Sequence, residues 1–304
     1  METIMAIGTM PNQATQDPYI EAEAAGFRER FNRRSFEISH HLAGHRLFQL
    51  HELLQLTKRT KETRPQHAYY DAGDIKIGQR WSDAPKRTFS IDEAIERIET
   101  AGAWIILKHA QKDPEYAVLI ERTMAELKAL IGQDMEPHVK QEDLIIFITS
   151  PKRISSYHID RECNFLLQIH GDKTIHVFDQ NDRDVLTEEE LEKFWTVDNN
   201  APVYKPTLQN RAVSYLLKPG KGVHIPVNAP HWLQNGDNVS VSLSVNFQFK
   251  DSARANVYRA NFFLRKLGMH PSPPGGGLIR DSLKNATLGS AMFVRRLFRG
   301  ESPW

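Results

Sequence analysis

Residues 218–235 read KPGKGVHIPVNAPHWLQN, and this stretch decides the fold class. It begins with a Pro-Gly turn, continues through a short strand, and turns again before a second strand that starts at His231. Pro226 and Pro230 fix φ within the second turn, so the loop that contains them delivers His231 in a defined position. The stretch therefore predicts antiparallel β-structure with a histidine at the start of a strand.

Further short runs of strand-forming residues lie on both sides of this stretch. They cover residues 144–148, 156–160, 165–169, 174–178, 212–217, 222–225, 231–234 and 239–249. Many short strands separated by tight turns predict a sandwich or barrel. Thr187 and Glu190 form a capping-box pair, which predicts a short helix within this region.

Helical patterns flank the predicted barrel on both sides. Ser90 and Glu93 form another capping-box pair, and Pro114 is a good first residue for a helix. The expected elements are an irregular N-terminus up to about residue 17, a helical region over 18–61 that residues 39–45 interrupt, and a connection over 64–87 with one short strand. They continue with helices over 90–100 and 114–132, a strand over 104–108, and C-terminal helices over 253–267 and 278–299. We expect four parts: an N-terminal helical segment and connection (1–88), an α/β segment packing on the barrel (89–142), the barrel (143–250) and C-terminal helices (251–304).

The composition narrows the class of protein. The 304 residues are 40% hydrophobic and 25% charged, which is typical of a soluble globular protein. A formal net charge of +1 gives no electrostatic reason to expect a nucleic-acid or membrane partner, and the basic run 295–299 is typical of a solvated helix face. Cys163 is the single cysteine, so no intrachain disulfide can form and a reducing cytoplasm is expected.

Targeting and membrane signals are not evident. The first residues lack the basic and apolar regions of a secretory signal. The longest apolar runs, such as residues 101–107, are far below the roughly 20 residues that span a bilayer. We expect a protein that is neither exported nor embedded in a membrane.

A candidate metal site combines His158 and Asp160 with His231. Residues i and i+2 of a strand point to the same face, so one strand can present an imidazole and a carboxylate together. Two histidines and one carboxylate on one face of a metal leave coordination positions free, as in non-haem Fe(II) oxygenases. The His-x-Asp triplet alone is weak, because a histidine beside an aspartate is often only a hydrogen-bonded pair.

Residues 226–235 resemble the second motif of the cupin superfamily, PxGxxHxxxN. Residues 226–235 supply its proline, its histidine (His231) and its final asparagine (Asn235). The motif's glycine is replaced by Asn228. Asparagine tolerates positive φ better than most residues, so this departure is mild.

Within that superfamily, residues 150–249 resemble the Jumonji C-type hydroxylases. In that family a His-x-Asp is followed by an Asn-aromatic strand, a tight turn and a lysine, and later by an Ile-Pro turn, a histidine and a strand ending in Val-Asn-Phe. This chain has the same anchors in the same order: His158-Ile159-Asp160, Asn164-Phe165, Gly171-Asp172-Lys173, Ile225-Pro226, His231 and Val245-Asn246-Phe247. The resemblance covers about 100 of the 304 residues.

The resemblance implies an α+β, β-rich fold: a double-stranded β-helix (cupin or jelly-roll) barrel with flanking helices. It implies that His158, Asp160 and His231 bind Fe(II) and carry catalysis. It also implies that Lys173 binds the distal carboxylate of the cosubstrate 2-oxoglutarate. Ser155, Asn164 and Asn246 occupy the positions that assist in cosubstrate binding.

Several residues in this region allow a second interpretation. Lys173 follows a turn and is alternatively a solvent-exposed hairpin lysine. His224 is either a further ligand candidate or a packed histidine. Trp232 either shapes the pocket or belongs to the core. Cys163 is either oxidation-sensitive or a small packed residue.

The leading hypothesis is an Fe(II)- and 2-oxoglutarate-dependent dioxygenase that hydroxylates a small molecule or a peptide or protein side chain, with O₂ as the other substrate. One alternative is a non-catalytic cupin-like protein that binds a ligand or regulates transcription. Another is a cupin enzyme that does not use 2-oxoglutarate. By analogy with the family, the flanking helices offer a surface for a homodimer. The sequence does not identify the substrate.

Overall fold

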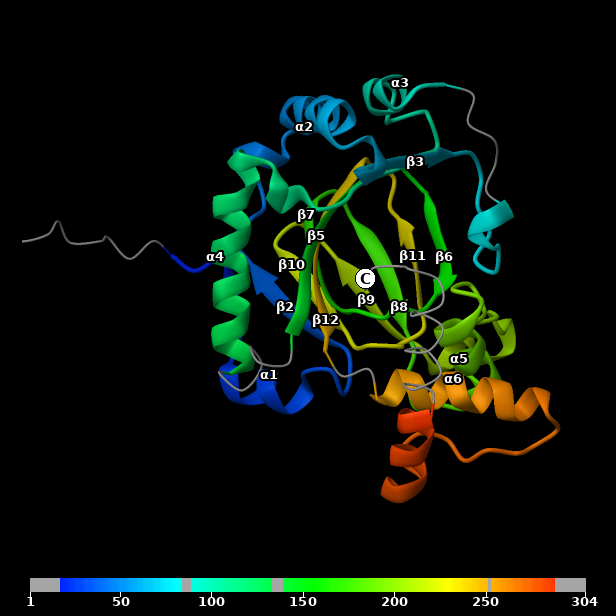
Figure 1. Ribbon diagram of the computed structural model, residues 1–304. Coiled ribbons are helices and arrows are strands. Elements are labelled where there is room, and N and C mark those ends of the chain that lie inside the picture. Colours follow the sequence, from blue (N-terminus) through cyan, green and yellow to red (C-terminus); the bar gives the residue numbers. More distant parts are fainter. Residues whose placement is uncertain (1–16, 84–88, 133–138, 251–252, 288–304) are drawn as a thin grey trace, which may run out of the picture.

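Two antiparallel sheets form the centre of the molecule (Figure 1). The computed structural model describes residues 17–83, 89–132, 139–250 and 253–287. In spatial order, the larger sheet contains β1 (Ile20–Glu21), β2 (Phe36–His40), β10 (Lys221–Ile225), β7 (Cys163–His170), β12 (Ser240–Phe249), β5 (Val139–Thr149), β4 (Ala103–Leu107) and β3 (Ala68–Ala72). The smaller sheet contains β6 (Ile154–His158), β11 (His231–Asn235), β8 (Lys173–Val177) and β9 (Val213–Leu217).

Strand β12 shows why the larger sheet has two different faces. Its sequence SVSLSVNF alternates small polar with apolar residues, so each kind lies on one face. Val241, Leu243, Val245 and Phe247 pack into the outer core. The polar residues, from Ser240 to Asn246, lie on the opposite face, which looks toward the smaller sheet.

The two sheets pack face to face through an apolar cluster. It combines Leu166, Val223 and Ile225 of the larger sheet with Ile175, Val177, Leu217 and Leu233 of the smaller one. Side chains that point between the sheets are called interior here. This interior also contains the polar face of β12, so the space between the sheets is apolar in one part and polar in another.

Helices cover the outer face of the larger sheet (Figure 1). They are α1 (Ala24–Arg30), α2 (Leu50–Thr63), α3 (Ile91–Glu96) and α4 (Pro114–Ile131). Fully buried residues such as Phe27, Leu53 and Leu127 connect these helices to the sheet in one continuous core. Burial of a side chain of this size contributes roughly 1.5–3 kcal/mol, so this layer is a main source of stability.

A second helical group lies at the edge of the smaller sheet (Figure 1). It consists of α5 (Glu188–Thr196), α6 (Ala253–Lys266) and helical residues 278–287. Arg265 binds both carboxylate oxygens of the buried Glu192, at 2.8 and 2.9 Å, and so joins α6 to α5. Within the described residues, no helix is both long and apolar enough to cross a membrane.

Most sequence-based element predictions are confirmed. All eight predicted strand runs of the barrel region form strands, and both capping boxes, Ser90 with Glu93 and Thr187 with Glu190, are present. The helix that follows Ser90 ends at Glu96, earlier than expected. The expected N-terminal irregular segment lies outside the described residues up to position 16. So do the basic run 295–299 and the last helix beyond position 287.

The helical prediction is wrong for residues 36–38, which form a strand together with residues 39–40 of the predicted interruption. This segment is strand β2, which pairs with both β1 and β10. Phe36, Ile38 and His40 are buried while Glu37 is exposed, which is the two-residue period of a strand. Pairing with β10, a segment about 180 residues away, overrides the local helical pattern.

Candidate metal centre

The three predicted metal ligands lie together between the sheets. His158 ends β6 and His231 begins β11, and the two are direct cross-strand partners with ring centroids 4.1 Å apart. Asp160 Oδ2 lies 3.8 Å from His158 Nε2 and 3.6 Å from His231 Nε2. One ligand atom from each residue falls within 4.8 Å of the others, so the group could hold a metal ion.

Each histidine is oriented by its own strand. His158 Nδ1 lies 2.6 Å from the Ser156 carbonyl oxygen, and His231 Nδ1 lies 2.9 Å from the Ala229 carbonyl oxygen. A carbonyl accepts, so each Nδ1 carries the proton and each Nε2 keeps its lone pair for a metal. Burial, followed by the nearby His158, lowers the pKa of His231 to about 4. His231 is therefore neutral at pH 7, as a metal ligand must be.

The expectation that one strand carries both His158 and Asp160 is corrected by the structure. Strand β6 ends at His158, and Asp160 lies two residues beyond it. The backbone N–H of Asn228 donates to the Asp160 carbonyl oxygen over 3.0 Å. The carboxylate thus reaches the histidines because contacts outside the strand direct it there.

Lys173 is an interior residue. It shares a face of β8 with Ile175 and Val177, and only 5% of it is exposed. Within the described residues no ion pair or hydrogen bond involves its ammonium, and burial alone lowers its pKa to about 7. This position excludes the exposed hairpin lysine. An unpaired buried amine is unfavourable unless an anion joins it, so the interior is suited to a carboxylate.

Ser155 reaches the same side as His158 through a β-bulge. Between the pairs His231–His158 and Leu233–Ser155, β6 has one residue more than β11. Leu233 is an interior residue and cross-strand partners share a face, so Ser155 is interior as well. Simple alternation from His158 would have placed Ser155 outside.

Asn164 and Asn246 lie opposite each other on β7 and β12. Asn164 Nδ2 donates to the Ser244 hydroxyl over 2.7 Å, and that hydroxyl donates to Asn246 Oδ1 over 3.2 Å. Asn164 Oδ1 is buried without a partner among the described residues. An unsatisfied buried acceptor and an unpaired ammonium on the interior face fit a site that binds a polar ligand.

The remaining histidine and tryptophan candidates lie outside the interior. His224 is fully buried and stacks on Phe31 on the outer face of the larger sheet. Cys163 packs beside it, with Sγ 3.9 Å from His224 Nδ1, as a small buried residue. Trp232 stacks on His176 and donates its indole N–H to Gln209, so it belongs to an outer aromatic cluster.

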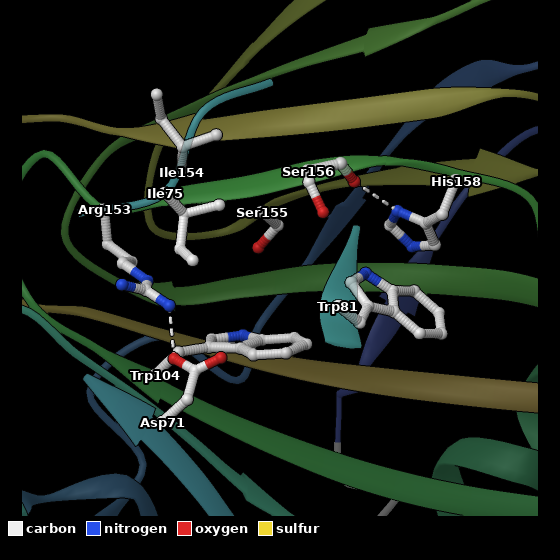
Figure 2. Close-up of a pocket in the computed structure, with 9 residues that line it drawn as sticks. All are labelled: Asp71, Ile75, Trp81, Trp104, Arg153, Ile154, Ser155, Ser156 and His158. Carbon is white, nitrogen blue, oxygen red and sulfur yellow. Dashed lines mark hydrogen bonds and ion pairs between the residues drawn. The ribbon is translucent and has the colours of Figure 1, made fainter. Parts of the chain in front are cut away.

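A small pocket opens beside His158 (Figure 2). Its lining residues are Asp71, Ile75, Trp81, Trp104, Arg153, Ile154, Ser155, Ser156 and His158. The ring of Trp81 meets that of His158 edge-on, with centroids 5.2 Å apart. Arg153 forms a buried ion pair with Asp71, as Figure 2 shows, so the wall carries no net charge from these two residues.

Sequence reasoning missed the two tryptophans and a second carboxyl group. Trp81 and Trp104 come from the segments before the barrel, where no local pattern indicates a pocket. Glu162 lies close to the ligands, and burial, followed by the charge of Asp160, raises its pKa to about 7. The tertiary fold brings Trp81 and Trp104 to the site, whereas Glu162 is only two residues from Asp160 in the sequence.

These features define a β-rich α+β protein with two facing antiparallel sheets and a His-Asp-His group between them. No protein-family model and no curated protein matches the sequence. Solved structures do match. The X-ray structure of E. coli ycfD is 15% identical, with a TM-score of 0.51, and the match covers 90% of this chain and 68% of that one.

A structure of YcfD, described as a ribosomal oxygenase from Escherichia coli, in complex with cobalt and 2-oxoglutarate is similar at 16% identity. Its TM-score is 0.49, over 90% of this chain and 67% of that one. At this level of identity, the likeness establishes a shared fold.

Proposed function

We propose that this protein is an Fe(II)- and 2-oxoglutarate-dependent dioxygenase that acts as a hydroxylase. The observation that carries the proposal is the pairing of two features in one interior. Three ligand atoms converge within 4.8 Å, and the ammonium of Lys173 is buried there without a partner among the residues that the structure describes. We also infer that the two facing sheets are the double-stranded β-helix of the Jumonji C-type hydroxylases.

The residues fit Fe(II) by their chemistry. His158 and His231 each present an unprotonated Nε2, and Asp160 presents a carboxylate oxygen. Two imidazoles and one carboxylate leave room for further ligands. With the metal and 2-oxoglutarate bound, O₂ supplies the oxidation that converts a substrate C–H into C–OH while 2-oxoglutarate becomes succinate and CO₂.

The interior residues would hold 2-oxoglutarate. Lys173, charged when an anion is present, would pair with the distal carboxylate. Ser155, Asn164 and Asn246 would add hydrogen bonds from neighbouring strands of the same interior. Such hydrogen bonds are needed, because a buried ion pair alone does not repay its desolvation.

The substrate would enter through the pocket of Figure 2, since this pocket borders His158. A small molecule and a peptide or protein side chain both remain candidates, and the similarity to a protein described as a ribosomal oxygenase makes a protein side chain worth testing. We propose a cytoplasmic location.

We also propose a homodimer through the flanking helices. In and near α6 and helical residues 278–287, the exposed large apolar residues are Phe263, Leu267, Met269, Leu278, Ile279 and Leu283.

The test is turnover of 2-oxoglutarate to succinate by the protein with Fe(II) and ascorbate. We expect slow turnover without substrate, and none in the Asp160→Ala variant. A correctly metallated protein that neither binds nor turns over 2-oxoglutarate would refute the proposal. Metal binding without 2-oxoglutarate binding would favour a cupin enzyme that does not use 2-oxoglutarate. Binding of neither the metal nor 2-oxoglutarate would favour a non-catalytic protein.

A further inference from the structure

Asp160 differs from the other two ligands in how it is held. His158 and His231 belong to paired strands, so the sheet fixes their backbone. Asp160 follows the end of β6 and has no strand partner within the described part of the chain. A carboxylate in a connection needs other contacts to keep a metal-binding geometry, because an unsupported ligand loses affinity.

Both sequence neighbours of Asp160 are associated with α5, one by apolar packing and one by a hydrogen bond. Ile159 is buried in a cluster with Leu191 and Phe194 of that helix. Arg161 donates to the Phe194 carbonyl oxygen over 2.8 Å, which also satisfies a carbonyl at the end of the helix. The segment that carries Asp160 is therefore attached to α5 on each side of the ligand.

A third connection passes through Asn228. Its backbone N–H donates to the Asp160 carbonyl oxygen over 3.0 Å, and its Oδ1 accepts the indole N–H of Trp195 over 3.1 Å. Asn228 is 6% exposed and has φ +61°, in the left-handed region. It lies in the same turn that delivers His231, so this one residue, through its side chain to Trp195 and its backbone to Asp160, links α5 to the segments that carry two of the three ligands.

From these contacts we infer that Trp195 and Asn228 are positioning residues, which set the place of Asp160 and of the loop before His231. This inference rests on the proposed metal site. A glycine at position 228 would accept the same φ but could not receive the Trp195 hydrogen bond. The Asn228 side chain therefore provides a contact with α5 that the backbone conformation alone does not provide.

Helix α5 is rigid enough for this role. Its N-terminus carries a complete capping box between Thr187 and Glu190. Glu192 is held by the forked contact with Arg265 of α6. Arg259 of α6 donates to the Trp195 carbonyl oxygen over 3.0 Å. Trp195 is thus fixed in its backbone, and its indole can act as a stable donor.

The test is Co²⁺ titration of metal-free protein for the wild type, Trp195→Phe, Asn228→Gly and the double variant. Loss of a contact behind a ligand typically weakens metal binding about 10-fold. We expect each single variant to show about that loss, with a change in the ligand-field absorption of bound Co²⁺. Since both remove the same hydrogen bond, the double variant should lose about as much as either single one, not about 100-fold.

Trp232→Phe is the matched control, because it also removes an indole hydrogen bond, of 3.0 Å, to Gln209. Trp232→Phe should lower the thermal midpoint of unfolding about as much as Trp195→Phe does. It should leave the Co²⁺ affinity unchanged. Three results would each overturn the inference. They are a wild-type Co²⁺ affinity in Trp195→Phe, additive losses of Co²⁺ affinity in the double variant, and a loss in Trp232→Phe equal to that in Trp195→Phe. A wild-type protein that binds no Co²⁺ would refute the metal site itself, and this inference with it.

Discussion

Two histidines in the stretch 218–235 occupy contrasting surroundings. His224 is 0% and His231 is 3% exposed, and burial lowers the pKa of both, to about 3 and about 4. Yet His224 faces the phenylalanines under α1, whereas His231 faces His158 and Asp160. Burial and a shifted pKa therefore do not identify the ligand.

The two histidines differ in the partner of the second ring nitrogen, Nε2. His224 has both nitrogens occupied: Nε2 accepts the Asn32 N–H over 2.9 Å and Nδ1 lies 3.0 Å from the Asn164 carbonyl oxygen. His231 uses only Nδ1 for the backbone, and its Nε2 points at the Asp160 carboxylate. A ligand histidine keeps one nitrogen for the metal, while a structural histidine satisfies both within the protein.

Asp160→Ala should give the largest effect, because it removes the carboxylate that distinguishes the two histidine sites. We expect metal affinity to fall by more than about 100-fold, since even contacts behind a ligand are worth 10–100-fold. Turnover of 2-oxoglutarate should disappear with it. Calorimetric titration with Mn²⁺ under anaerobic conditions measures the first effect.

Asp92→Ala is the matched control for this variant. The Asp92 side chain is 31% exposed, against 30% for Asp160, and it pairs with Lys61 away from the site. It should leave metal affinity unchanged. Equal metal affinity in Asp160→Ala and in the wild type would contradict the assignment of His231, and not His224, to a metal site.

Lys173→Met should give the next largest effect. Hydrogen bonds to charged groups contribute roughly 1.5–3 kcal/mol, so 2-oxoglutarate should bind about 10–100-fold more weakly. The same substitution should stabilise the ligand-free protein, because it removes a buried amine that has no partner in the described segments. Thermal unfolding and 2-oxoglutarate titration of the Mn²⁺-loaded protein test both parts. Unchanged 2-oxoglutarate affinity would place the cosubstrate elsewhere.

A smaller effect is expected in the pH dependence of 2-oxoglutarate binding. Lys173 has a pKa of about 7 in the ligand-free protein, so it is mostly neutral at pH 8. Pairing with a carboxylate raises this pKa, and binding at pH 8 should therefore take up close to one proton. Affinity should fall as pH rises above 7. Titrations in buffers of different ionisation enthalpy measure the proton, and Lys173→Met should abolish its uptake.

His224→Leu should have the smallest effect on the site and a clear effect on stability. It leaves the Asn32 N–H without its partner, which costs about 1–3 kcal/mol of unfolding free energy. Metal and 2-oxoglutarate affinities should not change. Denaturant unfolding and Mn²⁺ titration check the two statements, and a loss of metal affinity would make His224 part of the site.

The same variant also tests the pKa of His224. The folded-state pKa of about 3 lies below the ordinary 6.5, so the unfolded chain binds the proton first. This residue's stabilising contribution is complete above pH 6.5 and is lost as pH falls toward 3. His224→Leu should reduce the slope of stability against pH in that range by about one proton. His40 and His231 keep their own contributions.

The sequence predicted the strands and the ligand set because these depend on local alternation and on spaced anchors. The runs from residue 144 to 249 all form strands, and His158, Asp160 and His231 meet. Side chains alternate between the two faces of a strand, so one placed residue predicts the face of the others, as for Lys173 beside Ile175.

Other features depend on contacts that no local pattern contains. Strand β2 exists because it pairs with β10, and Ser155 is interior because of a bulge. The support of Asp160 by Trp195 joins segments 33 residues apart, from Trp195 to Asn228. Trp81 and Trp104 reach the pocket from outside the barrel region. These features follow from tertiary packing, which a single sequence does not reveal.

The most direct test of the central claim is an anaerobic titration of Fe(II)-loaded protein with 2-oxoglutarate, followed by visible absorption. Chelation of Fe(II) by the keto-acid end produces a charge-transfer band. The account predicts this band in the wild type and in His224→Leu, and its loss in Asp160→Ala. Fe(II)-loaded wild-type protein that shows no band with saturating 2-oxoglutarate would contradict the account.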